Sequence, residues 1–147
     1  MDRILEFAGN HTLLVFALVT SFLLVIFSEL RRKASAMLNI DANEAVKLIN
    51  NDAIILDLRS TEAYSRGHIV NAKHMPFDEL EARLDKLPGN KSQPILAVCD
   101  AGITSTKATN VLRNAGYESV YGLKGGMSAW NQAGMPVVTG KKTKSKR

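Results

Sequence analysis

The chain has 147 residues, enough for one domain of ordinary size, and its single cysteine and three widely separated histidines suggest neither an internal disulfide nor a metal site. The formal net charge of +5 comes mainly from the C-terminal end, because residues 38–139 contain 10 Lys and Arg against 11 Asp and Glu, whereas residues 140–147 contain five basic residues and no acidic one. A nearly neutral central region argues against a basic nucleic-acid-binding face, so we expect no nucleic-acid partner.

An uncharged apolar stretch near the N-terminus, TLLVFALVTSFLLVIF over residues 12–27, predicts a transmembrane helix. Extended back to residue 8, it has about 20 residues and is about 30 Å long as a helix, enough to cross the hydrocarbon layer. A cleaved signal peptide would have a basic start and a shorter apolar core, whereas this segment starts with the charge-balanced MDRILEF and ends in SELRRK. A buried core helix would show amphipathic periodicity, which is absent. We therefore predict a retained membrane anchor over residues 1–33, with a span of about residues 8–28.

Three basic residues, RRK at positions 31–33, follow the apolar stretch directly. Because cationic flanks stay on the cytoplasmic side, we expect a single pass with the N-terminus outside and a cytoplasmic domain over residues 34–139. Reducing conditions there would keep Cys99 as a free thiol. Residues 140–147 form a basic tail, which we interpret either as a solvated, disordered end or as a segment that contacts anionic lipid.

After the anchor, short β-rich runs alternate with helical stretches. We predict strands over residues 38–40, 53–59, 72–75, 95–99 and 119–123, and helices over residues 41–50, 61–66, 77–87, 105–114 and 127–133. Asp41 with Glu44 three residues later predicts a capping box at the start of the first of these helices. The alternation predicts an α/β fold with a mainly parallel sheet. Cys99 ends the most apolar strand, and ligands of such sheets bind beyond the carboxyl ends of the strands.

Three stretches together resemble the single-domain rhodaneses, a family of sulfurtransferases. They are LDLRSTEAYSRGHIVNAKHMP (residues 56–76), CDAGITS (residues 99–105) and GYESVYGLKGGMSAWNQAGMPV (residues 116–137). The resemblance covers nearly everything from Leu38 to Val138 and implies a rhodanese-like parallel sheet with helices on both faces. With the predicted anchor, the chain also resembles small inner-membrane rhodanese-like proteins of Gram-negative bacteria, which implies a location in the inner (plasma) membrane.

The resemblance implies that Cys99 is the catalytic nucleophile and becomes a persulfide. It would take sulfur from thiosulfate or another persulfide and pass it to a thiol acceptor, with neither a cofactor nor a metal. A loop that curls around the sulfur and enters a helix points backbone N–H groups and the positive end of the helix dipole at the anion. Gly102 would supply positive φ, Thr104 and Ser105 would offer hydroxyls and cap the helix, and Ile103 would face the core. The expected substrate-binding residues are Arg59, Asp100, Ala101, Gly102, Ile103, Thr104, Ser105 and Lys124. The alternative is that Cys99 is a buried, inert thiol.

The loop differs from that of family members that use thiosulfate well, because it has no cationic residue and carries Asp100 after the cysteine. A carboxylate there repels a dianionic donor unless a cation neutralises it or it points outward. Either thiosulfate reacts slowly, or the donor is a less anionic persulfide. Lys124 is the best-placed cation, although it could equally be a solvated turn residue. We interpret Arg59 as mainly architectural together with Asp57, with a position near the pocket mouth as the alternative.

Two further residues of the family segments are interpreted as structural. His68 resembles a histidine that is hydrogen-bonded under a turn, and Trp130 has the spacing of a core-facing helix residue. His68 is not expected to act as a base, because a loop that stabilises a thiolate needs no separate base.

Two other functions compete with sulfur transfer. A cysteine-dependent phosphatase of the same fold needs Cys-x5-Arg, but Ser105 stands at that position and no arginine occurs between it and Arg113. The more serious alternative is a membrane-anchored binding or scaffolding module with weak or no catalysis. Expected partners are therefore the small sulfur donor, the thiol acceptor, membrane lipid around the N-terminal helix and a membrane protein.

Overall fold

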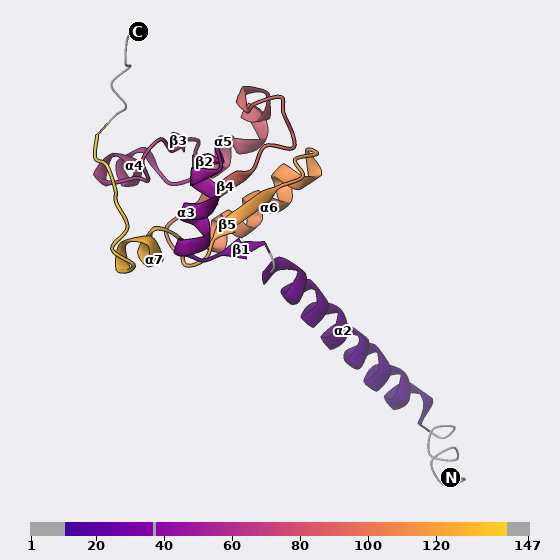
Figure 1. Cartoon of the computed structure of the whole chain (residues 1–147). Coiled ribbons are helices and arrows are strands. Elements are labelled where there is room, and N and C mark those ends of the chain that lie inside the picture. Colours follow the sequence, from indigo (N-terminus) through magenta and orange to yellow (C-terminus); the bar gives the residue numbers. More distant parts are fainter. Residues whose placement is uncertain (1–10, 37, 141–147) are drawn as a thin grey trace. The chain divides into compact units, whose positions relative to one another are not determined.

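The computed structural model describes residues 11–36 and 38–140, and for residues 31–36 it describes the backbone alone. The chain divides into two compact units, Met1–Met37 and Leu38–Arg147. The first residues of the predicted span and nearly all of the predicted basic tail lie outside the described residues. Each unit is considered by itself below (Figure 1).

The described residues of the N-terminal unit form the long helix α2 (Thr12–Ala36). Its stretch Thr12–Leu30 has a mean hydropathy of 2.5, and none of it is buried against other parts of the chain. The hydroxyls of Thr20 and Ser28 donate to backbone carbonyls of the same helix, so these polar groups are satisfied without solvent. The length and composition of this helix therefore permit it to cross a membrane, and a signal sequence near the N-terminus has the same properties.

Five parallel strands form the sheet of the second unit, in the order β1-β5-β4-β2-β3. They are β1 (Asn39–Ile40), β2 (Ile54–Asp57), β3 (Lys73–His74), β4 (Ile95–Val98) and β5 (Val120–Leu123). Asp57 pairs with Val98 and Ile40 with Leu123, so the carboxyl ends of β2, β4, β1 and β5 lie along one edge. The predicted α/β fold with a parallel sheet is confirmed.

Helices cover both faces of this sheet (Figure 1). They are α3 (Ala42–Asn50), α4 (Thr61–Arg66), α5 (Phe77–Leu80), the 3-10 helix η1 (Glu81–Lys86), α6 (Ile103–Asn114) and α7 (Gly126–Gln132). The capping box of Asp41 and Glu44 is present at the start of α3. The predicted helical stretch over residues 77–87 is present, but it changes from α-helix to 3-10 helix at Glu81 and kinks at Arg83. The longer rise per residue of that winding carries the chain between Leu80 and Leu87, both buried in one cluster.

Alternate residues of the central strands build two cores, one on each face. In β2 and β4, Leu56 and Ala97 pack with α5, η1 and α6, whereas Ile55 and Leu96 pack with α3, α4 and α7. Trp130 of α7 is buried in the second core, and its indole N–H donates to the carbonyl of Pro136. The predicted packing role of Trp130 is confirmed.

Candidate active site

Cys99 comes directly after β4, and the loop that follows it leads into α6. The residue is only 5% exposed. Its Sγ accepts hydrogen bonds from the backbone N–H of Gly102 at 3.1 Å and of Ser105 at 3.3 Å. The Ser105 hydroxyl lies 3.5 Å from the sulfur and donates to the Gly102 carbonyl at 2.9 Å. The expectation that loop amides converge on this sulfur is confirmed, and the arrangement stabilises negative charge on it.

The sulfur of Cys99 takes the place of a capping side chain at the start of α6. Gly102 is the N-cap residue, with φ +91° and no side-chain capping bond, and a Cβ there would lie 2.9 Å from the backbone N of Gly125. Ser105 is the third residue of the helix. Its backbone N–H, which would ordinarily donate to the oxygen of a capping side chain, donates to the Cys99 Sγ instead. The expectation that Thr104 and Ser105 cap the helix is therefore wrong, whereas that of positive φ at Gly102 is confirmed.

Ile103 is 71% exposed, so the expectation that it faces the core is wrong. The helix begins at residue 103 rather than 105, and its sheet-facing stripe runs through Ser105, Ala108, Thr109 and Leu112. Ile103 lies off that stripe and, with the exposed Ala101, forms an apolar lip beside the sulfur.

The start of α7 holds the loop from the other side. The N–H of Met127 donates to the Cys99 carbonyl at 2.8 Å, and the N–H of Ser128 donates to the Asp100 carbonyl at 3.1 Å. Gly126 has φ +58°, and a Cβ there would lie 2.2 Å from the Cys99 carbonyl oxygen. Sequence reasoning missed these positioning residues, and the Gly125-Gly126 pair was the signal that could have indicated them.

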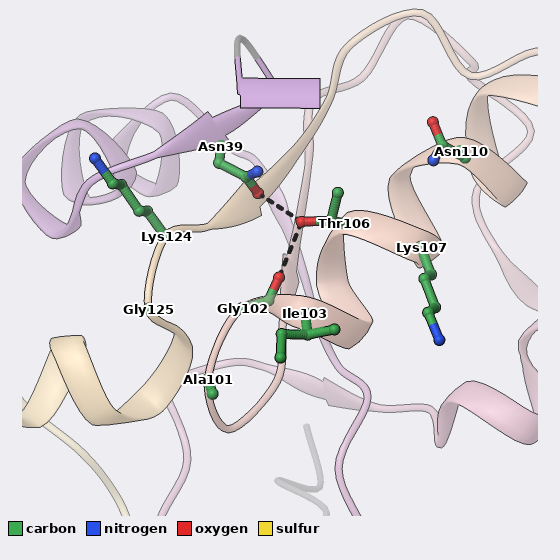
Figure 2. A pocket seen from close by; sticks show the side chains of 9 residues that line it. All are labelled: Asn39, Ala101, Gly102, Ile103, Thr106, Lys107, Asn110, Lys124 and Gly125. Atoms are coloured by element: carbon green, nitrogen blue, oxygen red, sulfur yellow. Dashed lines mark hydrogen bonds between the residues drawn. The ribbon is translucent and has the colours of Figure 1, made fainter. Parts of the chain in front are cut away.

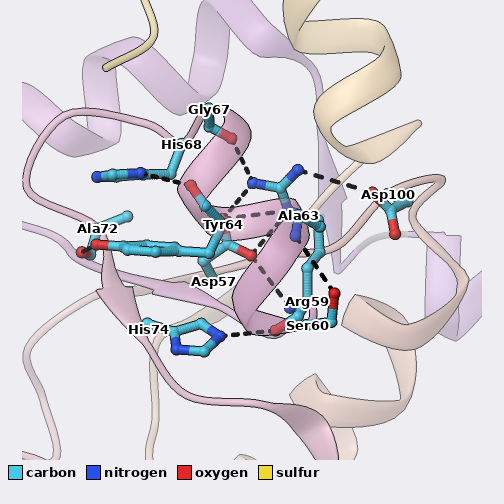
Figure 3. A network of polar contacts seen from close by, with 10 residues as sticks. All are labelled: Asp57, Arg59, Ser60, Ala63, Tyr64, Gly67, His68, Ala72, His74 and Asp100. Atoms are coloured by element: carbon cyan, nitrogen blue, oxygen red, sulfur yellow. Dashed lines mark hydrogen bonds and ion pairs between the residues drawn. The ribbon is translucent and has the colours of Figure 1, made fainter. Parts of the chain in front are cut away.

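Arg59 connects the loop to the end of β2 (Figure 3). Its guanidinium binds both Asp57 carboxylate oxygens, with Nη2 at 2.7 Å from Oδ2, and it donates to the Gly67 carbonyl at 2.6 Å. Nη1 lies 3.7 Å from the carboxylate of Asp100, whose side chain is 74% exposed. Both interpretations of Arg59 therefore hold, since it ties the strand end together and also lies beside the sulfur loop.

The charge state of Arg59 follows from these neighbours. Burial by itself lowers the pKa of the guanidinium, but the hydrogen bonds and negative charge of Asp57, with a smaller contribution from Asp100, raise the pKa above its ordinary value. Arg59 is thus a permanent cation, and it is shared between two carboxylates.

Near Arg59, three aromatic side chains lie against one another, with Tyr64 between His68 and His74 (Figure 3). The ring of His68 stacks on Tyr64 with 3.7 Å between centroids, and its Nδ1 lies 2.8 Å from the Tyr64 carbonyl oxygen. His74 Nε2 lies 2.8 Å from the Arg59 carbonyl, and the Tyr64 hydroxyl donates to the Ala72 carbonyl. His68 is buried and engaged with backbone, so its predicted structural role is confirmed.

Two depressions lie on either side of the loop. The first, with a volume of about 420 Å³, is lined by Leu58, Arg59, Ser60, Cys99, Asp100, Ala101, Ile103 and Thr104. The second, of about 510 Å³, is lined by Asn39, Ala101, Gly102, Ile103, Thr106, Lys107, Asn110, Lys124 and Gly125 (Figure 2). Lys124 thus lies in the second depression rather than beside Cys99, and the two share only Ala101 and Ile103. Within the described residues, no cluster of three or more His, Cys, Asp or Glu side chains is placed to hold a metal ion.

Comparisons with known proteins agree with this geometry. Residues 41–133 match the family model of the rhodanese-like domain. The uncharacterized protein YibN of Escherichia coli (strain K12) is 30% identical over 143 residues, which cover 96% of this chain and 100% of YibN. The thiosulfate sulfurtransferase GlpE of Vibrio cholerae serotype O1 (strain M66-2) is 32% identical over 101 residues, 68% of this chain and 93% of GlpE.

A solved structure extends the similarity to three dimensions. The solution structure of the rhodanese-like domain from the Anabaena sp. protein Alr3790 aligns with a TM-score of 0.62 at 30% identity. The alignment covers 75% of this chain and 86% of that one. With a matching family model over most of the folded unit, a shared fold and a sulfurtransferase among its relatives, the chain belongs to the rhodanese-like domain family.

Proposed function

We propose that this protein is a sulfurtransferase in which Cys99 carries the transferred sulfur. The observation that carries the proposal is the pair of backbone N–H groups, from Gly102 and Ser105, that donate to a sulfur at the edge of an open depression. An inert core thiol needs no such donors, whereas a thiolate nucleophile is stabilised by them.

The chemistry consists of two displacements at sulfur. The Cys99 thiolate attacks the outer sulfur of the donor, the S–S bond of the donor breaks, and the electron pair leaves with the rest of the donor. With thiosulfate the leaving group is sulfite, and Cys99 becomes a persulfide anion. A thiolate or cyanide acceptor then attacks the outer sulfur and regenerates the Cys99 thiolate.

The loop offers further hydrogen-bond donors to the sulfur atom that is added to Cys99. The backbone amides of Ala101, Ile103 and Thr104 donate to no acceptor among residues 38–140, and all three residues line the depression beside Cys99. These amides, together with the N-terminal end of α6, provide the partial positive charge that a persulfide anion requires.

The test is to incubate the reduced full-length protein, in detergent micelles, with thiosulfate and separately with glutathione persulfide. We expect intact-mass spectrometry to show a gain of about 32 Da, one sulfur atom, on Cys99, and cyanide to remove it as thiocyanate. The Cys99→Ser variant should show neither. Absence of a mass gain with both donors would overturn the proposal and favour the scaffolding module.

We also propose that α2 anchors the protein in the inner membrane as a single pass, with residues 34–139 as a cytoplasmic domain. The apolar stretch Thr12–Leu30 and the basic residues 31–33 support this orientation, and the similarity to YibN extends over the anchor region. In a Gram-negative host, the protein should stay in the membrane pellet at alkaline pH. Added protease should cleave the domain in inside-out vesicles but not in spheroplasts, and the reverse pattern would contradict the orientation.

A further inference from the structure

The two depressions beside the loop differ in charge. We propose that they select, over thiosulfate, the persulfide of a small thiol that carries carboxylates, because these carboxylates lie away from the transferred sulfur. Its sulfur end would occupy the depression at Cys99, and its carboxylates would lie in the second depression near Lys107 and Lys124. The inference rests on the proposed sulfur transfer and names the substrate class of that site.

The depression at Cys99 offers no free positive charge from the described residues. Of these, Arg59 and Asp100 are the only charged ones that line it, and they face each other at 3.7 Å. The remaining guanidinium nitrogens of Arg59 are bound to Asp57 and to the Gly67 carbonyl. Two carboxylates thus share one cation, so a thiosulfate dianion, whose charge lies next to the transferred sulfur, meets a local excess of negative charge.

The second depression has the opposite character. Lys107 and Lys124 line it together with two asparagines, and no carboxylate from residues 11–36 or 38–140 lines it. In the part of the chain described by the structure, neither lysine belongs to an ion pair. Figure 2 shows Lys124 before Gly125 and Lys107 on α6, on opposite sides of the depression, so a ligand within it has a flexible cationic side chain on either side.

The apolar lip of Ala101 and Ile103 connects the depressions, because both residues line each of them. A donor whose sulfur lies over Cys99 can cross this lip and place its body against the lysines. The exposure of Ile103 at the start of α6 has the same explanation, because the Ile103 side chain would pack on the apolar part of the donor.

The step balances without another reactant. The Cys99 thiolate attacks the outer sulfur of R–S–SH and forms the new S–S bond while the donor S–S bond breaks. The electron pair goes to the thiolate R–S⁻, which takes the proton of the outer sulfur. The products are the Cys99 persulfide anion and the thiol R–SH.

Three sulfur donors separate the contributions of the two depressions to donor choice. Each donor is added to the full-length protein in detergent micelles, and the rate of Cys99 persulfidation is followed by mass spectrometry. The donors are thiosulfate, glutathione persulfide, which carries two carboxylates, and 2-mercaptoethanol persulfide, which carries none. Replacing Lys107 and Lys124 together with glutamine should raise KM for glutathione persulfide about fivefold, as expected for two exposed ion pairs. The same variant should change KM for 2-mercaptoethanol persulfide much less, because this donor has no carboxylate for the lysines to bind. Lys47→Gln with Lys86→Gln, exposed lysines on α3 and η1, is the matched control.

Asp100→Asn tests the other depression, because it frees Nη1 of Arg59 and removes a negative charge. We expect kcat/KM for thiosulfate, a dianion, to rise about tenfold and that for 2-mercaptoethanol persulfide, which carries less charge, to rise less. Asp85→Asn on η1 is the control. If no donor modifies Cys99, the proposed function itself fails. If all three modify it but the lysine and Asp100 variants leave the donor preferences unchanged, only the present inference is overturned.

Discussion

Gly126→Ala tests whether the start of α7 positions the Cys99 loop. A Cβ at this position would lie 2.2 Å from the Cys99 carbonyl oxygen and 2.6 Å from the carbonyl carbon of Asp100, both backbone atoms. Ordinary contact requires the peptide to retreat by about 1 Å. The hydrogen bonds from Met127 and Ser128 to the two carbonyls, 2.8 and 3.1 Å long, would lengthen with it.

The expected decrease in the free energy of unfolding has two components, which a control variant separates. Alanine at positive φ costs about 1 kcal/mol, and loss of two backbone hydrogen bonds costs about 1 kcal/mol each, so Gly126→Ala should lower the free energy of unfolding by about 3 kcal/mol. Gly134 has a similar φ of +68°, but a Cβ added there would have no other atom within 4 Å. Gly134→Ala should therefore cost only about 1 kcal/mol.

Urea unfolding of the full-length protein in detergent micelles, followed by the fluorescence of Trp130, the only tryptophan, measures both variants. Persulfidation of Cys99 is then measured below the unfolding transition. A displacement of about 1 Å should slow it at least tenfold in Gly126→Ala and leave it nearly unchanged in Gly134→Ala. Equal stability and equal rates in the two variants would refute the assigned role of α7.

Three further predictions concern the loop and the network behind it. Ser105→Ala removes the buried hydroxyl that donates to the Gly102 carbonyl and lies 3.5 Å from the Cys99 sulfur, so it should cost about 1 kcal/mol in urea unfolding and slow the persulfidation of Cys99; an unchanged unfolding midpoint and an unchanged rate would contradict a role for this hydroxyl in holding the loop. Arg59→Met leaves the buried Asp57 carboxylate unpaired and should cost about 3–5 kcal/mol in urea unfolding, a cost that Arg59→Met with Asp57→Asn should largely recover if the pairing is its cause. Burial, with a smaller contribution from Asp57, raises the pKa of Tyr64 above its ordinary value of 10.0. Because the unfolded chain then loses this proton first, the free energy of unfolding should fall as pH rises above 10, and fall less in Tyr64→Phe; an equal fall in both proteins would show that Tyr64 is not responsible.

Much of the fold and the place of the candidate nucleophile could be predicted from the sequence, because they depend on local patterns. The apolar runs that became β2 and β4 are long enough to be recognised as buried strands, and Asp41 with Glu44 specifies a capping box without help from the rest of the chain. The position of Cys99 at a strand end, followed by Gly102, placed the sulfur at the carboxyl edge of the sheet.

Contacts between distant segments could not be predicted in this way. Only the folded chain brings Arg59 of one strand end to Asp100 of another, and sequence reasoning preferred Lys124, which lies across the loop. Nor does a local pattern reveal that a sulfur replaces the capping oxygen of α6, which starts the helix earlier and turns Ile103 outward. Helix caps and strand periodicity act between near neighbours in the chain, whereas charge pairing and the exposed lip depend on which strand ends meet, and tertiary packing alone decides that.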